Sequence, residues 1–134
     1  MPHLVVLYTK NLEAQSDIER LCRALADAML GVRDGAGQQV FPTGGVRVLA
    51  YPAAHAAVAD GKRDYGFAYL NLRMARGRSA EVKQRAGHAL LEAARKHFEP
   101  LFATGYLGLT LQIDEGQEVF DAKHSTIHPL FGKP

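Results

Sequence analysis

Three residues of this sequence, Pro2, Arg47 and Arg78, are of types and in positions that could carry out chemistry. If Met1 is removed after synthesis, which the compact Pro2 permits, the chain begins with a secondary amine that can accept a proton. An arginine beside a helix start or a buried sheet can hold a carboxylate through two parallel hydrogen bonds. The sequence therefore offers a candidate proton acceptor and two candidate carboxylate-binding groups.

Each of these residues also has a purely structural interpretation. A proline near the start of a strand is tolerated because no ladder donor is needed there. Arg47 follows the Gly44-Gly45 turn at the start of a predicted strand, and Arg78 stands between a predicted strand end and a predicted helix start. Spacing alone leaves open whether the arginines bind a ligand or are solvated surface side chains.

The histidines and the cysteine give weaker signals. His124 and His128 are four residues apart, a spacing that suits a metal only on a helix. Pro129 and the lack of a third ligand argue against a metal site. The single cysteine, Cys22, lies on a predicted apolar stripe, and we expect a core thiol rather than a nucleophile. The sequence contains no glycine-rich phosphate motif, no Gly-x-Ser-x-Gly and no paired cysteines.

Composition limits the classes of protein and partner. The chain has 134 residues, 47% of them hydrophobic, and a net charge of +2, which is too slight to indicate nucleic-acid binding. One cysteine excludes an internal disulfide and favours a reducing compartment. The sequence shows neither the pattern of a secretory signal nor an apolar run of the roughly 20 residues that span a bilayer. We therefore expect a cytoplasmic globular protein with no nucleic-acid or membrane partner.

The first half of the chain predicts a strand, a helix and a second strand. Ser16 and Glu19 form the Ser-x-x-Glu capping box at the helix start, and apolar side chains follow at helical spacing. In order, the predicted elements are a strand at 3–9, a polar connection at 10–15, a helix from Ser16 to Gly31, a glycine-rich loop at 32–45, and a strand at 46–51 stopped by Pro52.

The second half repeats this plan. Ser79 is a predicted N-cap, and Pro100 is predicted to break the helix that follows. In order, the predicted elements are a strand at 65–74, this helix, a strand at 107–113 and an irregular tail. We expect a single domain over 1–134, a pseudo-repeat of 1–58 and 64–115, and a C-terminal tail over 116–134.

Two β-α-β units predict an α/β (α+β) fold with a four-stranded mixed sheet. Each unit should contain parallel strands joined by a right-handed crossover. Two helices can cover only one face of the sheet, yet both faces of the predicted strands carry apolar side chains. An apolar sheet face exposed on a monomer is an aggregation hazard, so we expect a homo-oligomer.

Several short motifs, in order and with their spacing, resemble the tautomerase superfamily with the macrophage-migration-inhibitory-factor fold. Within it, the resemblance is strongest to isomerases of 5-carboxymethyl-2-hydroxymuconate. The motifs are Met1-Pro2-His3, Phe41-Pro42, Gly45-Val46-Arg47, Ala59-Asp60-Gly61, Asp64-Tyr65-Gly66-Phe67, Gly77-Arg78-Ser79 and His128-Pro129-Leu130-Phe131. The resemblance covers the whole chain.

The resemblance implies a homotrimer and an enzyme of aromatic-compound catabolism. Pro2 would act as general base and acid in a 1,3-allylic keto–enol proton transfer. Arg47 and Arg78 would bind the carboxylates of a di- or tricarboxylate, and no metal or organic cofactor would be required. An ordinary α-amino group titrates at about 7.7 to 8.0, and both burial and neighbouring arginines would lower the pKa of the proline amine.

Two other interpretations remain open at this stage. The same scaffold could tautomerise another keto acid, such as phenylpyruvate, because a fold does not fix its substrate. The order β-α-β-β-α-β also describes ferredoxin-like binding modules, including the RNA-recognition type. Those modules carry an aromatic motif that begins with a basic residue. The nearest segment here, Tyr65-Gly66-Phe67-Ala68-Tyr69, lacks that basic residue and the motif's pattern.

Overall fold

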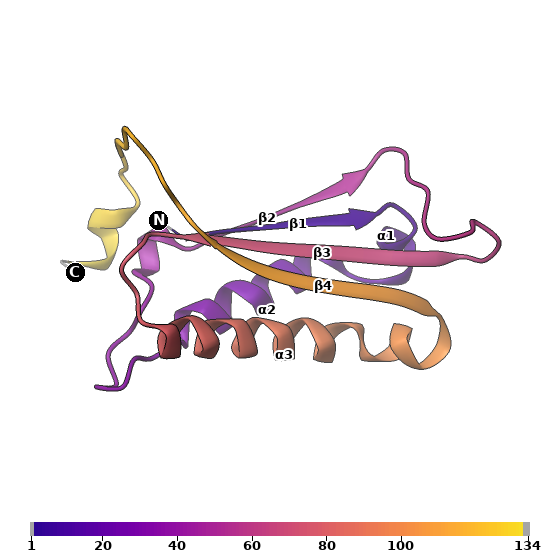
Figure 1. Cartoon of the computed structure of the whole chain (residues 1–134), viewed down its shortest axis with the longest axis horizontal. Helices are drawn as coiled ribbons and strands as arrows, with labels where there is room; N and C mark the ends of the chain where they lie inside the picture. The colour runs from indigo at the N-terminus through magenta and orange to yellow at the C-terminus, as the bar shows by residue number, and fades with distance from the viewer. Residues whose placement is uncertain (1, 133–134) are drawn as a thin grey trace.

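The computed structural model describes residues 2–132, in which a four-stranded sheet carries two long helices on one face (Figure 1). The strands are β1 (His3–Thr9), β2 (Arg47–Ala53), β3 (Tyr65–Met74) and β4 (Tyr106–Glu115). The helices are α1 (Leu12–Gln15), α2 (Ile18–Leu30) and α3 (Ala80–Thr104), with short 3-10 turns η1 (Thr43–Gly45) and η2 (His128–Phe131).

The strand order β2-β1-β3-β4 joins two parallel pairs through an antiparallel centre. β1 pairs in parallel with β2, β3 pairs in parallel with β4, and β1 and β3 run antiparallel. This confirms the predicted mixed sheet with helices on one face. The buried core lies between the sheet and the helices, where alternate strand residues such as Leu4, Val6, Leu70 and Leu72 are fully buried.

The start of α2 differs from the prediction. The side chain of Asp17, not of Ser16, accepts the hydrogen bond from the Arg20 main-chain N–H, at 3.0 Å. The Ser16 hydroxyl instead lies 2.7 Å from Nε2 of His97 on α3. The predicted polar connection at 10–15 was also wrong in part, because Leu12 is buried and opens the short helix α1. A contact with α3 therefore overrides the local capping signal.

Two prolines that were predicted to end elements lie inside them. Pro100 is within α3, which continues to Thr104, and the helix then ends at Gly105. Leu101 packs against the core, so burial offsets the loss of one helical hydrogen bond. Pro52 is within β2, which is an edge strand paired only with β1, and an edge strand can lack a ladder donor.

The sheet face opposite the helices is open, and its part over β1 and β2 carries large apolar side chains. Leu7, Leu49 and Tyr51 lie on it with 46%, 48% and 49% of their surfaces exposed. Leu7 and Tyr51 are register partners on adjacent strands, so their side chains share one face. None of the helices within residues 2–132 is both long enough and apolar enough to cross a membrane.

Candidate active site at the start of β1

Pro2 is buried beside the Gly44–Gly45 turn. A Cβ built on Gly45 would lie 3.7 Å from Cδ of Pro2 and 3.5 Å from Nε2 of His128. The proline ring and the His128 imidazole therefore flank the same glycine, one from the start of the chain and the other from its tail. Met1 lies outside the described residues, so its removal stays a prediction.

The turn requires glycine because the tail crosses it closely. A Cβ on Gly44 would meet Cα of His128 at 2.8 Å, a distance that real side chains do not adopt. Both Gly44 and Gly45 are buried, and η1 follows Pro42, whose extended backbone leads into the turn. The absence of side chains here lets η2 of the tail pack onto η1.

Arg47 begins β2 immediately after this turn and is anchored to it. Its Nη1 donates to the carbonyl of Gly44 at 2.6 Å and to that of Val46 at 3.3 Å. The guanidinium is partly buried, and no salt bridge within residues 2–132 involves it. A guanidinium has five N–H donors, so most of its hydrogen-bonding capacity remains for a ligand.

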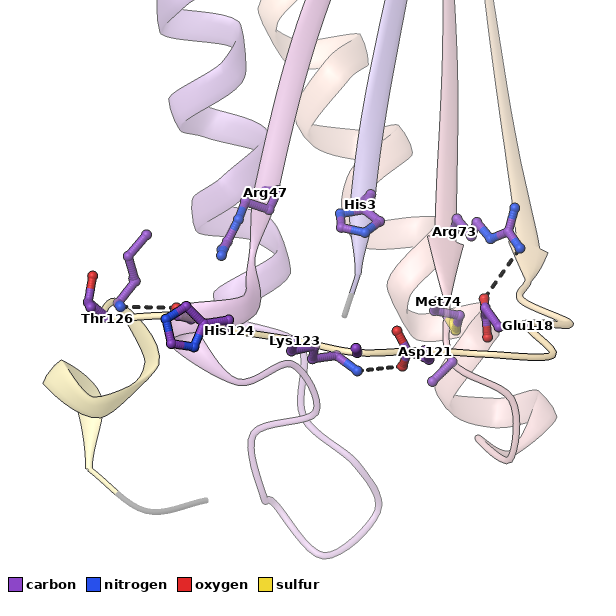
Figure 2. Close-up of a pocket in the computed structure, with 13 residues that line it drawn as sticks. His3, Arg47, Arg73, Met74, Glu118, Asp121, Lys123, His124 and Thr126 are labelled. Carbon is purple, nitrogen blue, oxygen red and sulfur yellow. Dashed lines mark hydrogen bonds and ion pairs between the residues drawn. The ribbon is translucent and has the colours of Figure 1, made fainter.

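A pocket of about 770 Å³ opens at the same end of the sheet, and we call it the strand-end pocket. His3, Arg47 and Arg73 line one wall from three neighbouring strands (Figure 2). The segment after β4 crosses beneath these strands and supplies the opposite wall, with Glu118, Asp121, Lys123 and His124. The pocket thus brings basic side chains from both walls around one space.

Both acidic side chains that line the pocket, Glu118 and Asp121, form ion pairs. Arg73 Nη2 lies 3.3 Å from Glu118 Oε1, and Lys123 Nζ lies 2.6 Å from Asp121 Oδ2. Burial lowers the pKa of His3 below its ordinary value, and the charges of Arg47 and Arg73 lower it further. His3 is therefore neutral at neutral pH and can donate or accept a hydrogen bond.

Arg78 contacts the loop just before the turn, at Val40 and Phe41. Its guanidinium carbon sits 5.1 Å from the centre of the buried Phe41 ring, in a cation–π arrangement. Its Nη2 donates to the carbonyl of Val40 at 3.4 Å. Pro2 and Arg47 thus both lie at the turn, and of the three predicted site residues Arg47 lines the strand-end pocket, whereas Pro2 and Arg78 do not.

Sequence reasoning missed Arg73, Glu118 and Lys123. A signal for Arg73 was available, because the side chains of Tyr69, Asn71 and Arg73 alternate onto the open face of β3. Nothing in the sequence pairs Arg73 with Glu118, which comes from the segment after the next strand.

The two histidines of the tail and the cysteine of α2 lie at separate places in the structure. His124 lines the strand-end pocket, whereas His128 lies against the glycine turn. Within residues 2–132, no three His, Cys, Asp or Glu side chains gather as metal ligands would. Cys22 is partly buried on α2 rather than in the core, and burial, followed by the charge of Glu19, raises the pKa of its thiol. Its thiolate, the nucleophilic form, is thus disfavoured.

Comparison with known proteins finds that the chain is similar to isomerases. The model of the 5-carboxymethyl-2-hydroxymuconate isomerase family matches residues 2–131. A 5-carboxymethyl-2-hydroxymuconate Delta-isomerase of Escherichia coli is 29% identical over 131 residues, which are 98% of this chain and 99% of that protein.

Two crystal structures are similar over nearly the whole chain. One, of a 5-carboxymethyl-2-hydroxymuconate delta-isomerase, is 57% identical with a TM-score of 0.94 and covers 100% of this chain and 95% of its own. The other, of a 5-carboxymethyl-2-hydroxymuconate isomerase from Deinococcus radiodurans R1, is 35% identical with a TM-score of 0.86. That match covers 98% of this chain and 95% of the other.

Proposed function

The chain belongs to the 5-carboxymethyl-2-hydroxymuconate isomerase family, and we propose that it converts 5-carboxymethyl-2-hydroxymuconate to its 2-oxo-3-ene isomer in aromatic-compound catabolism. The substrate is a six-carbon conjugated diacid with a third carboxylate on its carboxymethyl branch. The reaction moves one proton from the 2-hydroxyl to carbon, and it needs neither a metal nor an organic cofactor. Family membership favours this enzyme over a ferredoxin-like binding module.

Pro2 is the proposed general base and acid. Once Met1 has been removed, its nitrogen is a secondary amine at the start of β1. Burial disfavours the charged ammonium form, so the resting amine is ready to accept a proton. It takes the proton of the 2-hydroxyl, which leaves a dienolate, and the resulting prolinium returns a proton to a carbon of that dienolate.

One relationship carries the proposal: Pro2 and Arg47 meet at the Gly44–Gly45 turn. A cation beside the base stabilises the negative charge that the dienolate develops, and its planar fork fits a carboxylate. Arg78, which contacts the loop before the turn, is the second proposed carboxylate-binding residue. The stack on Phe41 holds its guanidinium in place, which reduces the entropy lost when it binds a ligand.

We also propose the assembly, the location and the division of the chain. The open apolar face with Leu7, Leu49 and Tyr51 supports a homotrimer in which the sheets of three copies face inward. A single cysteine supports a cytoplasmic location. The two parallel β-α-β units support one domain over 1–134, with the pseudo-repeat 1–58 and 64–115 and the tail 116–134.

An ultraviolet assay of 2-hydroxymuconate derivatives tests the proposed chemistry. Protein that starts at Pro2 should be active, whereas protein with one extra N-terminal residue should be inactive, because the proline nitrogen is then an amide. Pro2→Ala should lower kcat/KM by at least about 100-fold, within the range of general-base contributions. Wild-type kcat/KM in Pro2→Ala, or a preference for phenylenolpyruvate over the muconate, would contradict the proposal.

A further inference from the structure

We propose that Arg73 is a specificity-determining residue, which binds the substrate carboxylate farthest from Pro2 and is held by Glu118 until that carboxylate arrives. This inference rests on the proposed function and deepens it. It gives the enzyme a means to select conjugated dicarboxylates over monocarboxylates of the same carbon skeleton.

The strand register places Arg73 in one row with two other basic side chains. His3 is the register partner of Arg47 on β2 and of Arg73 on β3. Residues directly opposite each other project to the same face of a sheet, so all three side chains line one wall (Figure 2). Neighbouring strands are about 4.8 Å apart, so the Cα atoms of Arg47 and Arg73 are separated by about 10 Å.

That separation favours a ligand with an anionic group at each end. Arg47 adjoins the turn that holds Pro2, so it would take the carboxylate next to the reacting atoms. A carboxylate at the other end of a six-carbon chain would then approach Arg73. His3, which lies between the two arginines and is neutral, can accept or donate a hydrogen bond without adding a third positive charge.

The present partner of Arg73 is a carboxylate that a ligand could replace. Glu118 contacts only Nη2 of Arg73, at 3.3 Å, and the side chains of the pair are 54% and 45% exposed. In the single chain, an ion pair this exposed contributes little to stability, so its exchange for another carboxylate costs little. Asp114, the β4 register partner of Arg73, accepts a hydrogen bond from Asn71 at 2.9 Å. Glu118 is therefore the acid that occupies Arg73 when no substrate is bound.

The test compares two stable ligands with the same diene skeleton. Muconate is hexadienedioate, with two carboxylates, and sorbate is hexadienoate, with one. Isothermal titration of the full chain should show tighter binding of muconate than of sorbate. Arg73→Gln should weaken muconate binding by about 10- to 100-fold, as expected for the loss of a charge-assisted hydrogen bond, and leave sorbate binding unchanged.

Glu118→Gln separates competition from a structural role. If Glu118 competes with the ligand for Arg73, this variant should bind muconate about 2- to 5-fold more tightly, and the gain should disappear in the double variant with Arg73→Gln. If the ion pair only holds the tail in place, Glu118→Gln should weaken binding of both ligands. That second result would overturn the inference.

Steady-state kinetics with the tricarboxylate complete the test. Arg73→Gln should raise KM and change kcat by less than about 3-fold, because Arg73 lies away from the reacting atoms. Arg95→Gln, which changes an exposed arginine on α3, is the matched control and should alter neither constant. If the wild type is active and Arg73→Gln binds muconate as tightly as the wild type does, this inference alone is contradicted. If the wild type is inactive, the proposed function is contradicted.

Discussion

Gly44 and His128 pack so closely that no side chain fits between them, because a Cβ on Gly44 would lie 2.8 Å from Cα of His128. Gly44→Ala should therefore displace the tail or the turn. If the turn moves, the Gly44 carbonyl that accepts a hydrogen bond from Arg47 moves with it. We expect kcat/KM to fall by about 10- to 100-fold, because small misplacements of binding groups carry such costs. Kinetics and circular dichroism of the purified variant measure activity and folding.

Gly35→Ala is the control for this substitution. Gly35 lies in the loop between α2 and η1, and the nearest atom to a Cβ there, Oε1 of Glu81, is 3.8 Å away. This variant should keep wild-type kinetics. Equal kcat/KM for Gly44→Ala and Gly35→Ala would show that the packing of the tail against the turn does not affect the active site.

Arg78→Lys tests whether the planar guanidinium, and not only its charge, is needed. Lysine keeps the positive charge but cannot place a planar group on the Phe41 ring while donating to the Val40 carbonyl. We expect kcat/KM to fall by about 10-fold in Arg78→Lys and by about 100-fold in Arg78→Ala. Arg76→Lys, two residues earlier and exposed, is the control. Full activity in Arg78→Lys would mean that charge alone suffices.

The elements that local signals determine were predicted well. The strand predicted at 65–74 has the same bounds as β3, Tyr65–Met74. Ser79 was predicted as an N-cap, and its hydroxyl oxygen accepts a hydrogen bond from the Val82 N–H at 3.2 Å. Pro2 and Arg47 were predicted as site residues from order and resemblance, and in the structure both lie at the glycine turn, while their roles stay predictions.

What the sequence did not reveal depends on contacts between distant segments. The choice of Asp17 over Ser16 as N-cap depends on His97, which lies on a different helix. The pairing of Arg73 with Glu118 joins residues 45 apart, across the length of α3 and β4. Such contacts depend on the tertiary arrangement, which periodicity and capping rules do not describe.

His3 should couple ligand binding to proton uptake. Burial and then the charges of Arg47 and Arg73 lower the pKa of His3. A carboxylate bound between the arginines offsets their charge, which raises the pKa of His3 in the complex. Ligand affinity should therefore increase as pH falls, because the complex binds the proton more readily than the free protein. Titration of muconate between about pH 5.5 and pH 7.5 measures this slope.

Two variants identify the group responsible for that slope. The other titratable and charged side chains that face this space are Glu118, Asp121, Lys123 and His124. His3→Asn should flatten the pH dependence of muconate affinity, whereas His124→Asn should leave it in place. The reverse pattern would assign the proton to the tail and contradict the role of His3.

His97 should make folding stability depend on pH. Burial lowers the pKa of His97, and the charge of Arg20 adds to this, while Asp17 opposes it. The unfolded chain therefore binds a proton more readily than the folded chain. This contribution to stability is present above the ordinary pKa of 6.5 and is lost as pH falls below it. Urea midpoints at about pH 7.5 and pH 5 should differ less in His97→Asn than in wild type.

Leu49→Glu tests the proposed homotrimer. Leu49 lies on the open sheet face beside β1 with 48% of its surface exposed, so in the proposed trimer it is covered by another copy. A carboxylate buried there without a partner opposes association, and sedimentation velocity should show a smaller species than wild type. Phe102→Glu is the matched control, because Phe102 is 42% exposed but lies near the end of α3, away from the open face. If Leu49→Glu sediments as wild type does, this face is not the interface, and the apolar side chains on β1 and β2 need another explanation.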